Sequence, residues 1–222
     1  MDMTVLLALQ SGRTPFLTWL FSWITQLGGQ MFLMLALCAL HWCLDKRAAL
    51  YLAVNFLFGT LFNQVLKLSF RVERPWVRDA RIQPVAGAVS AATGYSFPSG
   101  HTANATAFFG GLAVYYKKWW VSALGLVLLL LVAFSRLYLG VHTPQDVLVS
   151  LLAGVVLLYL SYKALAWIEQ NPRRDGLVLC AGLALAAGMT AFALCRPDQA
   201  DAMKTAGGVC GLMLGWFWEK RR

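Results

Sequence analysis

Three short polar strings stand out in a chain that is otherwise mostly apolar. They are KLSFRVERP at residues 67–75, PSGH at residues 98–101 and SRLYLGVHTPQD at residues 135–146. Together they supply ammonium and guanidinium groups, a Ser-Gly backbone and two imidazoles. Such groups can hold a phosphate, attack its phosphorus atom and protonate the group that leaves. The strings therefore predict phosphoryl chemistry and leave the substrate open.

The third string pairs a histidine with an acid at a predicted helix start. Thr143, Pro144 and Asp146 are typical of an N-cap, a first helical residue and a capping-box acid. A carboxylate there can accept one ring N–H of His142, which leaves the other nitrogen with a lone pair for attack on phosphorus. Asp146 would also stabilise the cation that forms. His41, alone in an apolar run, is expected to be a core histidine.

The second string is expected to begin a helix that faces the phosphate. Ser99 follows a proline and is a natural N-cap, and Gly100 and His101 would occupy the first turn. The free backbone N–H groups of a helix start bind phosphate well. A cap alone would not explain a histidine in the first turn, so His101 is a candidate for the chemistry.

Three cations complete the predicted site. Lys67, Arg74 and Arg136 lie at predicted helix ends, where any one of them could simply extend its side chain to the membrane interface. Together they can neutralise the charge of a phosphoryl group in transfer. The sequence has no Asp, Glu and His cluster with metal-ligand spacing, so we expect no metal and no cofactor.

The composition indicates a membrane protein. Of 222 residues, 59% are hydrophobic and only 13% are charged, which is too apolar for an ordinary solvated surface. The net charge is +9, but the basic residues form no stripe or arm, so nucleic acid is not expected as a partner. The five cysteines lie in or beside apolar runs without metal-ligand spacing and are expected to be packing residues.

Apolar runs near the length of a bilayer-spanning helix predict an all-α, polytopic membrane bundle of about six or seven transmembrane helices. The predicted spans are residues 27–44, 48–68, 99–116, 119–139, 144–167, 176–195 and 202–218. Residues 14–26 are apolar but short, so residues 1–26 are expected to form an interfacial or re-entrant segment. Without an internal repeat or a soluble linker, residues 1–222 are predicted to form a single domain.

Alternation across the bilayer predicts that the strings meet. Lys67 closes the second span and Ser99 opens the third, while Arg136 closes the fourth and Pro144 opens the fifth. Because each helical hairpin brings its two joined ends to one face, all three strings are expected on the same face. Four helix ends would then build one site.

The distribution of charge predicts the orientation. The opposite face carries nine basic residues, which are Lys46, Arg47, Lys117, Lys118, Arg173, Arg174, Lys220, Arg221 and Arg222. The motif face also carries nine, which are Arg13, Lys67, Arg71, Arg74, Arg78, Arg81, Arg136, Arg196 and Lys204. Three of the second set belong to the motifs, which leaves six against nine. By the positive-inside rule we expect a plasma-membrane protein with an extracytoplasmic active site.

The three strings resemble the signature of the type 2 phosphatidic acid phosphatase superfamily, which includes integral-membrane lipid phosphatases and soluble vanadium haloperoxidases. Its pattern is Lys, six residues, Arg-Pro; then Pro-Ser-Gly-His; then Ser-Arg, five residues, His, three residues, Asp, and each fixed position is present here. The motifs cover residues 67–146, and the hydropathy suits the membrane branch. The first 26 residues and the last two predicted spans carry no part of the signature.

The resemblance implies a role for each matching position. It makes His142 the nucleophile that forms a phosphohistidine, Asp146 its orienting partner and His101 the acid for the leaving group. The remaining matches would surround the phosphate, and they are Lys67, Arg74, Ser99, Gly100 and Arg136. It also implies a helical core whose site opens toward the outer leaflet.

The expected substrate is a lipid phosphate, either a polyprenyl diphosphate such as undecaprenyl diphosphate or phosphatidic acid. Arg71, Arg78 and Arg81 lie outside the motif and could hold a second phosphate, although a solvated basic loop explains them equally well. The compact chain and this loop favour the polyprenyl diphosphate. Two alternatives remain open: a phosphotransferase that exchanges lipid headgroups, and a non-catalytic lipid or anion transporter. The oligomeric state is also open.

Overall fold

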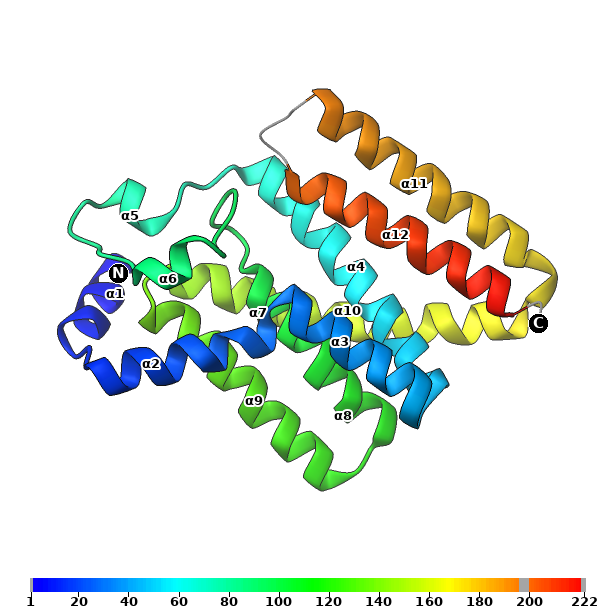
Figure 1. Ribbon diagram of the computed structural model, residues 1–222, viewed down its shortest axis with the longest axis horizontal. Helices are drawn as coiled ribbons and strands as arrows, with labels where there is room; N and C mark the ends of the chain where they lie inside the picture. Colours follow the sequence, from blue (N-terminus) through cyan, green and yellow to red (C-terminus); the bar gives the residue numbers. More distant parts are fainter. Residues whose placement is uncertain (1, 196–199, 221–222) are drawn as a thin grey trace. The chain divides into compact units, whose positions relative to one another are not determined.

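The structure, a computed structural model, describes residues 2–195 and 200–220, and every regular element among them is a helix (Figure 1). The α-helices are α1 (Asp2–Ser11), α2 (Pro15–Ile24), α3 (Gln30–Ala39), α4 (Lys46–Phe70), α5 (Pro75–Arg78), α6 (Ala86–Val89), α7 (Gly100–Ala105), α8 (Gly111–Tyr116), α9 (Trp119–Tyr138), α10 (Pro144–Gln170), α11 (Asp175–Cys195) and α12 (Ala200–Glu219). Between them lie the 3-10 turns η1 (Thr25–Gly28) and η4 (Pro172–Arg174) and the π-helical turns η2 (Leu40–Leu44) and η3 (Thr106–Gly110). The all-helical prediction is confirmed.

The chain divides into two compact units, residues 1–159 and 160–222. Every residue of the predicted site lies in the first unit. In the second unit α11 and α12 pack closely, and a Cβ atom added to Gly182 would come within 2.5 Å of the Met213 side chain. The single-domain organisation stays a prediction. Arg196, Arg221 and Arg222 of the charge comparison lie outside the described residues.

Several helices are suited to crossing a bilayer. In the described part of the chain, four helical segments are long and apolar enough, and they contain α4, α9, α10 and α11. A fifth candidate is the pair formed by α2 with η1 and α3 with η2, which is bent by 54°. The predicted count of six or seven is therefore not confirmed. The helical run after Ser99 covers residues 100–116 as α7, η3 and α8 and begins with polar residues, and α12 carries Asp201 and Lys204 near its start.

The outer faces of the long helices are apolar. Leu126 and Leu130 of α9 are 56% and 49% exposed, and Leu152 and Val155 of α10 are 61% and 62% exposed. A protein surrounded by water rarely leaves so many large apolar side chains uncovered. These faces are matched to hydrocarbon, as expected for an integral membrane protein.

Helix caps fix where the motif residues stand. Asp45 caps the start of α4 by accepting a hydrogen bond from the Ala48 N–H at 3.0 Å. Arg71 ends the same helix in the left-handed region, with φ of 48°, and this places Lys67 in its last turn. After α9 the chain turns at Gly140, whose φ of 76° favours glycine, and then enters α10 at Pro144.

The N-terminal bend packs against the start of α7. A Cβ atom on Gly28 would lie 2.7 Å from both the His101 carbonyl oxygen and the Val132 side chain, so only glycine fits this contact. Asn104 also donates a hydrogen bond from its Nδ2 to the Gly28 carbonyl at 3.1 Å. The break between α2 and α3 is thus held directly on the helix that carries His101.

Candidate active site

His142 and Asp146 lie together, as the sequence predicts. The Nδ1 atom of His142 is 3.3 Å from Oδ2 of Asp146, and both side chains are 2% exposed. Thr143 and Asp146 form the predicted reciprocal cap: the Thr143 N–H donates to Oδ2 at 2.8 Å, and the Asp146 N–H donates to the Thr143 hydroxyl at 3.4 Å. The cap therefore orients the carboxylate toward the imidazole.

A second loop also holds the carboxylate. The Ser96 hydroxyl is fully buried and donates a hydrogen bond to Oδ2 of Asp146 at 2.6 Å. The same oxygen thus faces Ser96, Thr143 and His142. Several donors around one oxygen stabilise an ionised, immobile carboxylate.

Arg74 lies on the other side of the ring. Its Nη1 is 3.1 Å from Nε2 of His142. A guanidinium can only donate, so Nε2 must accept, and the ring proton belongs on Nδ1, which faces Asp146. The contacts thus select the tautomer in which Nε2 carries a lone pair.

The Arg74 side chain is also tied to the backbone. It donates to the carbonyls of Gly94 at 2.9 Å, Val141 at 3.1 Å and Thr93 at 2.6 Å. This differs from the expectation of a simple phosphate ligand, because most of its donors fasten the 79–97 loop to the turn before His142. Arg74 joins the first string to the third.

Burial strongly affects His142. It lowers the pKa of the imidazole well below its ordinary value, because the charged form would lose its hydration. The hydrogen bond to Asp146 acts in the opposite direction, and the positive charges of Arg74 and Arg136 lower the pKa further. The ring is therefore neutral at neutral pH.

The start of α7 joins the second string to the third. Ser99 is the predicted N-cap, with its hydroxyl accepting from the Thr102 N–H at 3.4 Å. Its own N–H donates to the Asp146 carbonyl at 3.1 Å, and Ser150 Oγ donates to the Ser99 carbonyl at 3.0 Å. A Cβ atom on Gly100 would meet nothing within 4 Å, so the backbone there can be approached closely.

Arg136 is completely buried in the last turn of α9. Its Nη1 donates to the Thr25 hydroxyl at 2.7 Å, while Nε and Nη2 have no hydrogen-bond partner among the described residues. A buried guanidinium with unpaired donors is costly, so these groups are suited to an anion.

His101 and Lys67 complete the cluster. Electrostatic interactions link His101 to Arg136, His142, Lys67 and Arg74, so these five groups lie near one another. The structure thus brings the predicted site residues together within the first unit. In the part of the chain that is described, no three His, Cys, Asp or Glu side chains are grouped to hold a metal.

The three arginines in and after the first string that lie outside the motif have other surroundings than Arg74. Arg81 pairs with Asp79 at 2.8 Å and, by its hydrogen bonds, lowers the pKa of Asp79 to about 2. Arg71 donates from Nε to the Leu68 carbonyl at 3.0 Å, and Arg78 is exposed. The arrangement resembles the solvated basic loop more than a second phosphate site.

Sequence reasoning missed Ser96 and Thr25. Ser96 lies only two residues before Pro98, and its proximity to the second string was the one available signal. Thr25 is separated from Arg136 by 111 residues in the chain, so nothing in the local pattern could have identified it. Both became visible only through tertiary contacts.

Comparisons with known proteins match this arrangement. Residues 48–170 match the PAP2 superfamily. Phosphatidylglycerophosphatase B of Bacillus subtilis is 30% identical over 162 residues, which cover 67% of this chain and 75% of that protein. Undecaprenyl-diphosphatase of Sulfolobus acidocaldarius is 30% identical over 117 residues, covering 52% of this chain and 54% of that protein.

A solved structure shares the fold. The crystal structure of Aquifex aeolicus LpxE superimposes with a TM-score of 0.65 and 26% identity, covering 73% of this chain and 94% of that one.

The chain spans about half the length of most of the curated relatives it matches. The matched region contains all eight predicted site residues, and with the shared fold it shows that this chain is an integral membrane protein of the PAP2 superfamily.

Proposed function

We propose that this protein is a membrane lipid phosphatase that hydrolyses a lipid phosphate or diphosphate through a phosphohistidine on His142. The observation that carries the proposal is the pair of contacts on one ring, with Asp146 at Nδ1 and Arg74 at Nε2. They leave the lone pair of a neutral imidazole on the nitrogen beside the cations. The names of relatives that act on phosphatidylglycerophosphate and undecaprenyl diphosphate support a lipid substrate.

In the first step, Nε2 of His142 forms a bond to phosphorus while the bond from phosphorus to the leaving oxygen breaks. Arg74 must release Nε2 as the phosphorus approaches, and its Nη1–H can then turn to a phosphoryl oxygen. Asp146 keeps the Nδ1 proton and stabilises the imidazolium. We expect Asp146 to orient and stabilise the His142 ring, while the proton stays on Nδ1.

The charge on the phosphoryl oxygens needs donors that are already in place. Arg136 supplies Nε and Nη2, Lys67 adds an ammonium, and the backbone at Gly100 adds an N–H group. Preorganised donors in a buried site stabilise such charge without a metal. His101 protonates the leaving oxygen, and in the second step it accepts a proton from the water that attacks the phosphohistidine. Inorganic phosphate then leaves.

We also propose that the site lies on the outer side of the plasma membrane. The support is the excess of basic residues on the opposite face, once the motif cations are set aside. A substrate presented in the outer leaflet could then reach the helix ends directly.

The test is phosphate release by purified protein in detergent with a chelator. Phosphatidic acid, undecaprenyl diphosphate and a soluble phosphate ester are compared for wild type and His142→Ala. His41→Ala is the matched control, because it removes a histidine from η2, outside the motifs. We expect His142→Ala to abolish release and His41→Ala to retain it. Full activity in His142→Ala would contradict the proposal, and transfer of phosphate to an added alcohol in place of water would favour the phosphotransferase.

A further inference from the structure

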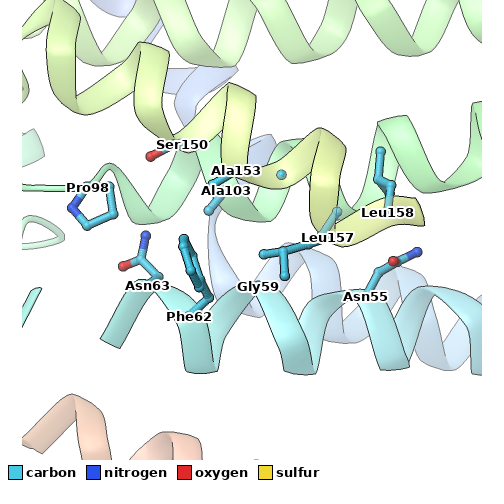
Figure 2. Close-up of a pocket in the computed structure, with 12 residues that line it drawn as sticks. Asn55, Gly59, Phe62, Asn63, Pro98, Ala103, Ser150, Ala153, Leu157 and Leu158 are labelled. Carbon is cyan, nitrogen blue, oxygen red and sulfur yellow. The ribbon is translucent and has the colours of Figure 1, made fainter. Parts of the chain in front are cut away.

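A groove runs beside the catalytic cluster within the first unit. It is lined by α4, by α7 with η3, and by α10, and it is shallow and partly open. Figure 2 shows Pro98, Asn63 and Ser150 toward one end and Asn55 and Leu158 toward the other. Between these ends the lining is mostly apolar, and much of it is glycine and alanine, so a hydrocarbon chain could lie along it.

The groove contains buried polar atoms without partners. Asn63 is 7% exposed and Asn55 is 2% exposed, and the Nδ2 atom of each has no hydrogen-bond partner among the described residues. A buried amide that makes no hydrogen bond costs about 1–3 kcal/mol. An unpaired amide in the lining of this groove is therefore suited to a ligand that brings an acceptor.

The position of Asn63 relates this amide to the phosphate. Asn55, Gly59, Asn63 and Lys67 recur at every fourth residue of α4, so they share one face of the helix. At about 1.5 Å of rise per residue, Asn63 lies about 6 Å along the axis from Lys67, and Asn55 lies about 12 Å deeper. Pro98 and Ser150, which also line the groove, adjoin Ser99 in the chain and in space.

We infer that Asn63 is a specificity-determining residue that donates a hydrogen bond to an ester carbonyl or hydroxyl oxygen of the lipid, just below its phosphate. The inference deepens the proposed function and depends on it. A glycerolipid phosphate or a sphingoid phosphate has such an oxygen a few bonds from phosphorus. Its apolar chain would continue along the groove past Gly59.

A polyprenyl chain fits this groove less well. It has no oxygen beyond its phosphates, so the Asn63 amide would remain buried without a partner when the chain is bound. The second phosphate of a polyprenyl diphosphate would also need cations, and Arg81 is engaged by Asp79. The inference therefore favours an oxygen-bearing lipid over the polyprenyl diphosphate.

The test compares Asn63→Leu with wild type on phosphatidic acid, farnesyl phosphate and phenyl phosphate. Loss of one hydrogen bond of about 1.4 kcal/mol predicts a roughly tenfold higher KM for phosphatidic acid. Farnesyl phosphate and phenyl phosphate should be hydrolysed with unchanged kcat and KM. Asn55→Leu is the matched control, because it removes a buried, unpartnered amide that lies too deep to reach the lipid ester.

Equal losses on all three substrates would overturn the inference, because they would indicate a structural role for Asn63. An unchanged KM for phosphatidic acid would also overturn it. Binding is measured separately by native mass spectrometry of His142→Ala with and without Asn63→Leu, using phosphatidic acid and farnesyl phosphate. If wild type hydrolyses no lipid but this pair still differs only for phosphatidic acid, the proposed function fails and the lipid contact stands. If the pair does not differ, the contact itself is absent.

Discussion

The two nitrogens of His142 are made different by residues from separate parts of the chain. Asp146, four residues later, accepts from Nδ1, while Arg74, in the first string, donates to Nε2. Neither contact alone would determine where the proton lies. Together they leave one tautomer, and the reactive nitrogen is the one covered by Arg74. The resting site therefore has an oriented nucleophile that a phosphoryl group must uncover.

The protonation state of His142 is directly measurable. Because burial lowers its pKa, the ring should stay neutral as the pH falls through about 6.5, where an exposed histidine becomes protonated. The 15N spectrum of histidine-labelled protein should show the Nδ1–H tautomer across this range, and His142→Ala assigns the signal. Protonation of His142 near the ordinary pKa of histidine would contradict the burial of the ring. The Nε2–H tautomer would contradict the contacts with Asp146 and Arg74.

Thr25 is expected to act as a positioning residue for Arg136. Thr25→Val removes the acceptor at 2.7 Å from Nη1, and a hydrogen bond to a charged group contributes about 1.5–3 kcal/mol. We expect KM to rise about tenfold or more with a smaller change in kcat, and Thr25→Ser to restore it. Thr18→Val is the control, since it makes the same substitution on α2, about two turns before Thr25. If Thr25→Val merely unfolded the protein, kcat and thermal stability would fall together. Failure of Thr25→Ser to restore KM would contradict a role for the hydroxyl group.

The sequence predicts a contact between residues that are close along the chain, but it does not predict contacts between distant segments. His142 and Asp146 share one helix start, so four residues of sequence were enough to pair them. The tie from Arg74 to the carbonyls of Thr93 and Gly94 depends on how the 79–97 loop folds back. No periodicity describes that loop, so the engagement of Arg74 was not foreseeable.

At the scale of elements, the site is made by helix ends. α4 ends after Lys67, α7 begins after Ser99, α9 ends after Arg136 and α10 begins after Thr143. Helix alternation predicted this meeting point from hydropathy alone. It did not predict that the bend between α2 and α3 would pack against the same end, because residues 14–28 carry no signature.

The bend can be tested by filling its closest contact. Gly28→Ala adds a Cβ atom 2.7 Å from the His101 carbonyl and the Val132 side chain, so α7 must shift. Overpacking of this kind costs about 1–3 kcal/mol, and we expect lower thermal stability together with reduced phosphate release. Gly188→Ala is the control, since its Cβ atom would meet nothing within 4 Å. Normal activity and stability in Gly28→Ala would show that the bend is not packed on α7.

At the scale of the whole molecule, hydropathy predicted the class of protein better than the number of spans. The long runs became α4, α9, α10 and α11, each of which meets the length and hydropathy of a span. Residues 99–116 were predicted as one span, and α7, the π-helical turn η3 and α8 follow one another there without a break, but the first turns of this run carry site residues. Where a segment builds the site, polar residues replace the apolar ones that mark a span.

Sidedness is the remaining property of the whole molecule that the sequence predicts. α9 has 20 residues, and at about 1.5 Å per residue it is about 30 Å long, so Lys118 at its start and His142 beyond its end should lie on opposite sides of a bilayer. If the site is extracytoplasmic, Ala80→Cys in the exposed loop should react with a membrane-impermeant maleimide on intact cells. Lys118→Cys should react only after the cells are permeabilised. The wild-type chain has five cysteines of its own, so its labelling is measured as the background. The reverse pattern would place the site in the cytoplasm, and a lipid in the inner leaflet would then be the substrate to test.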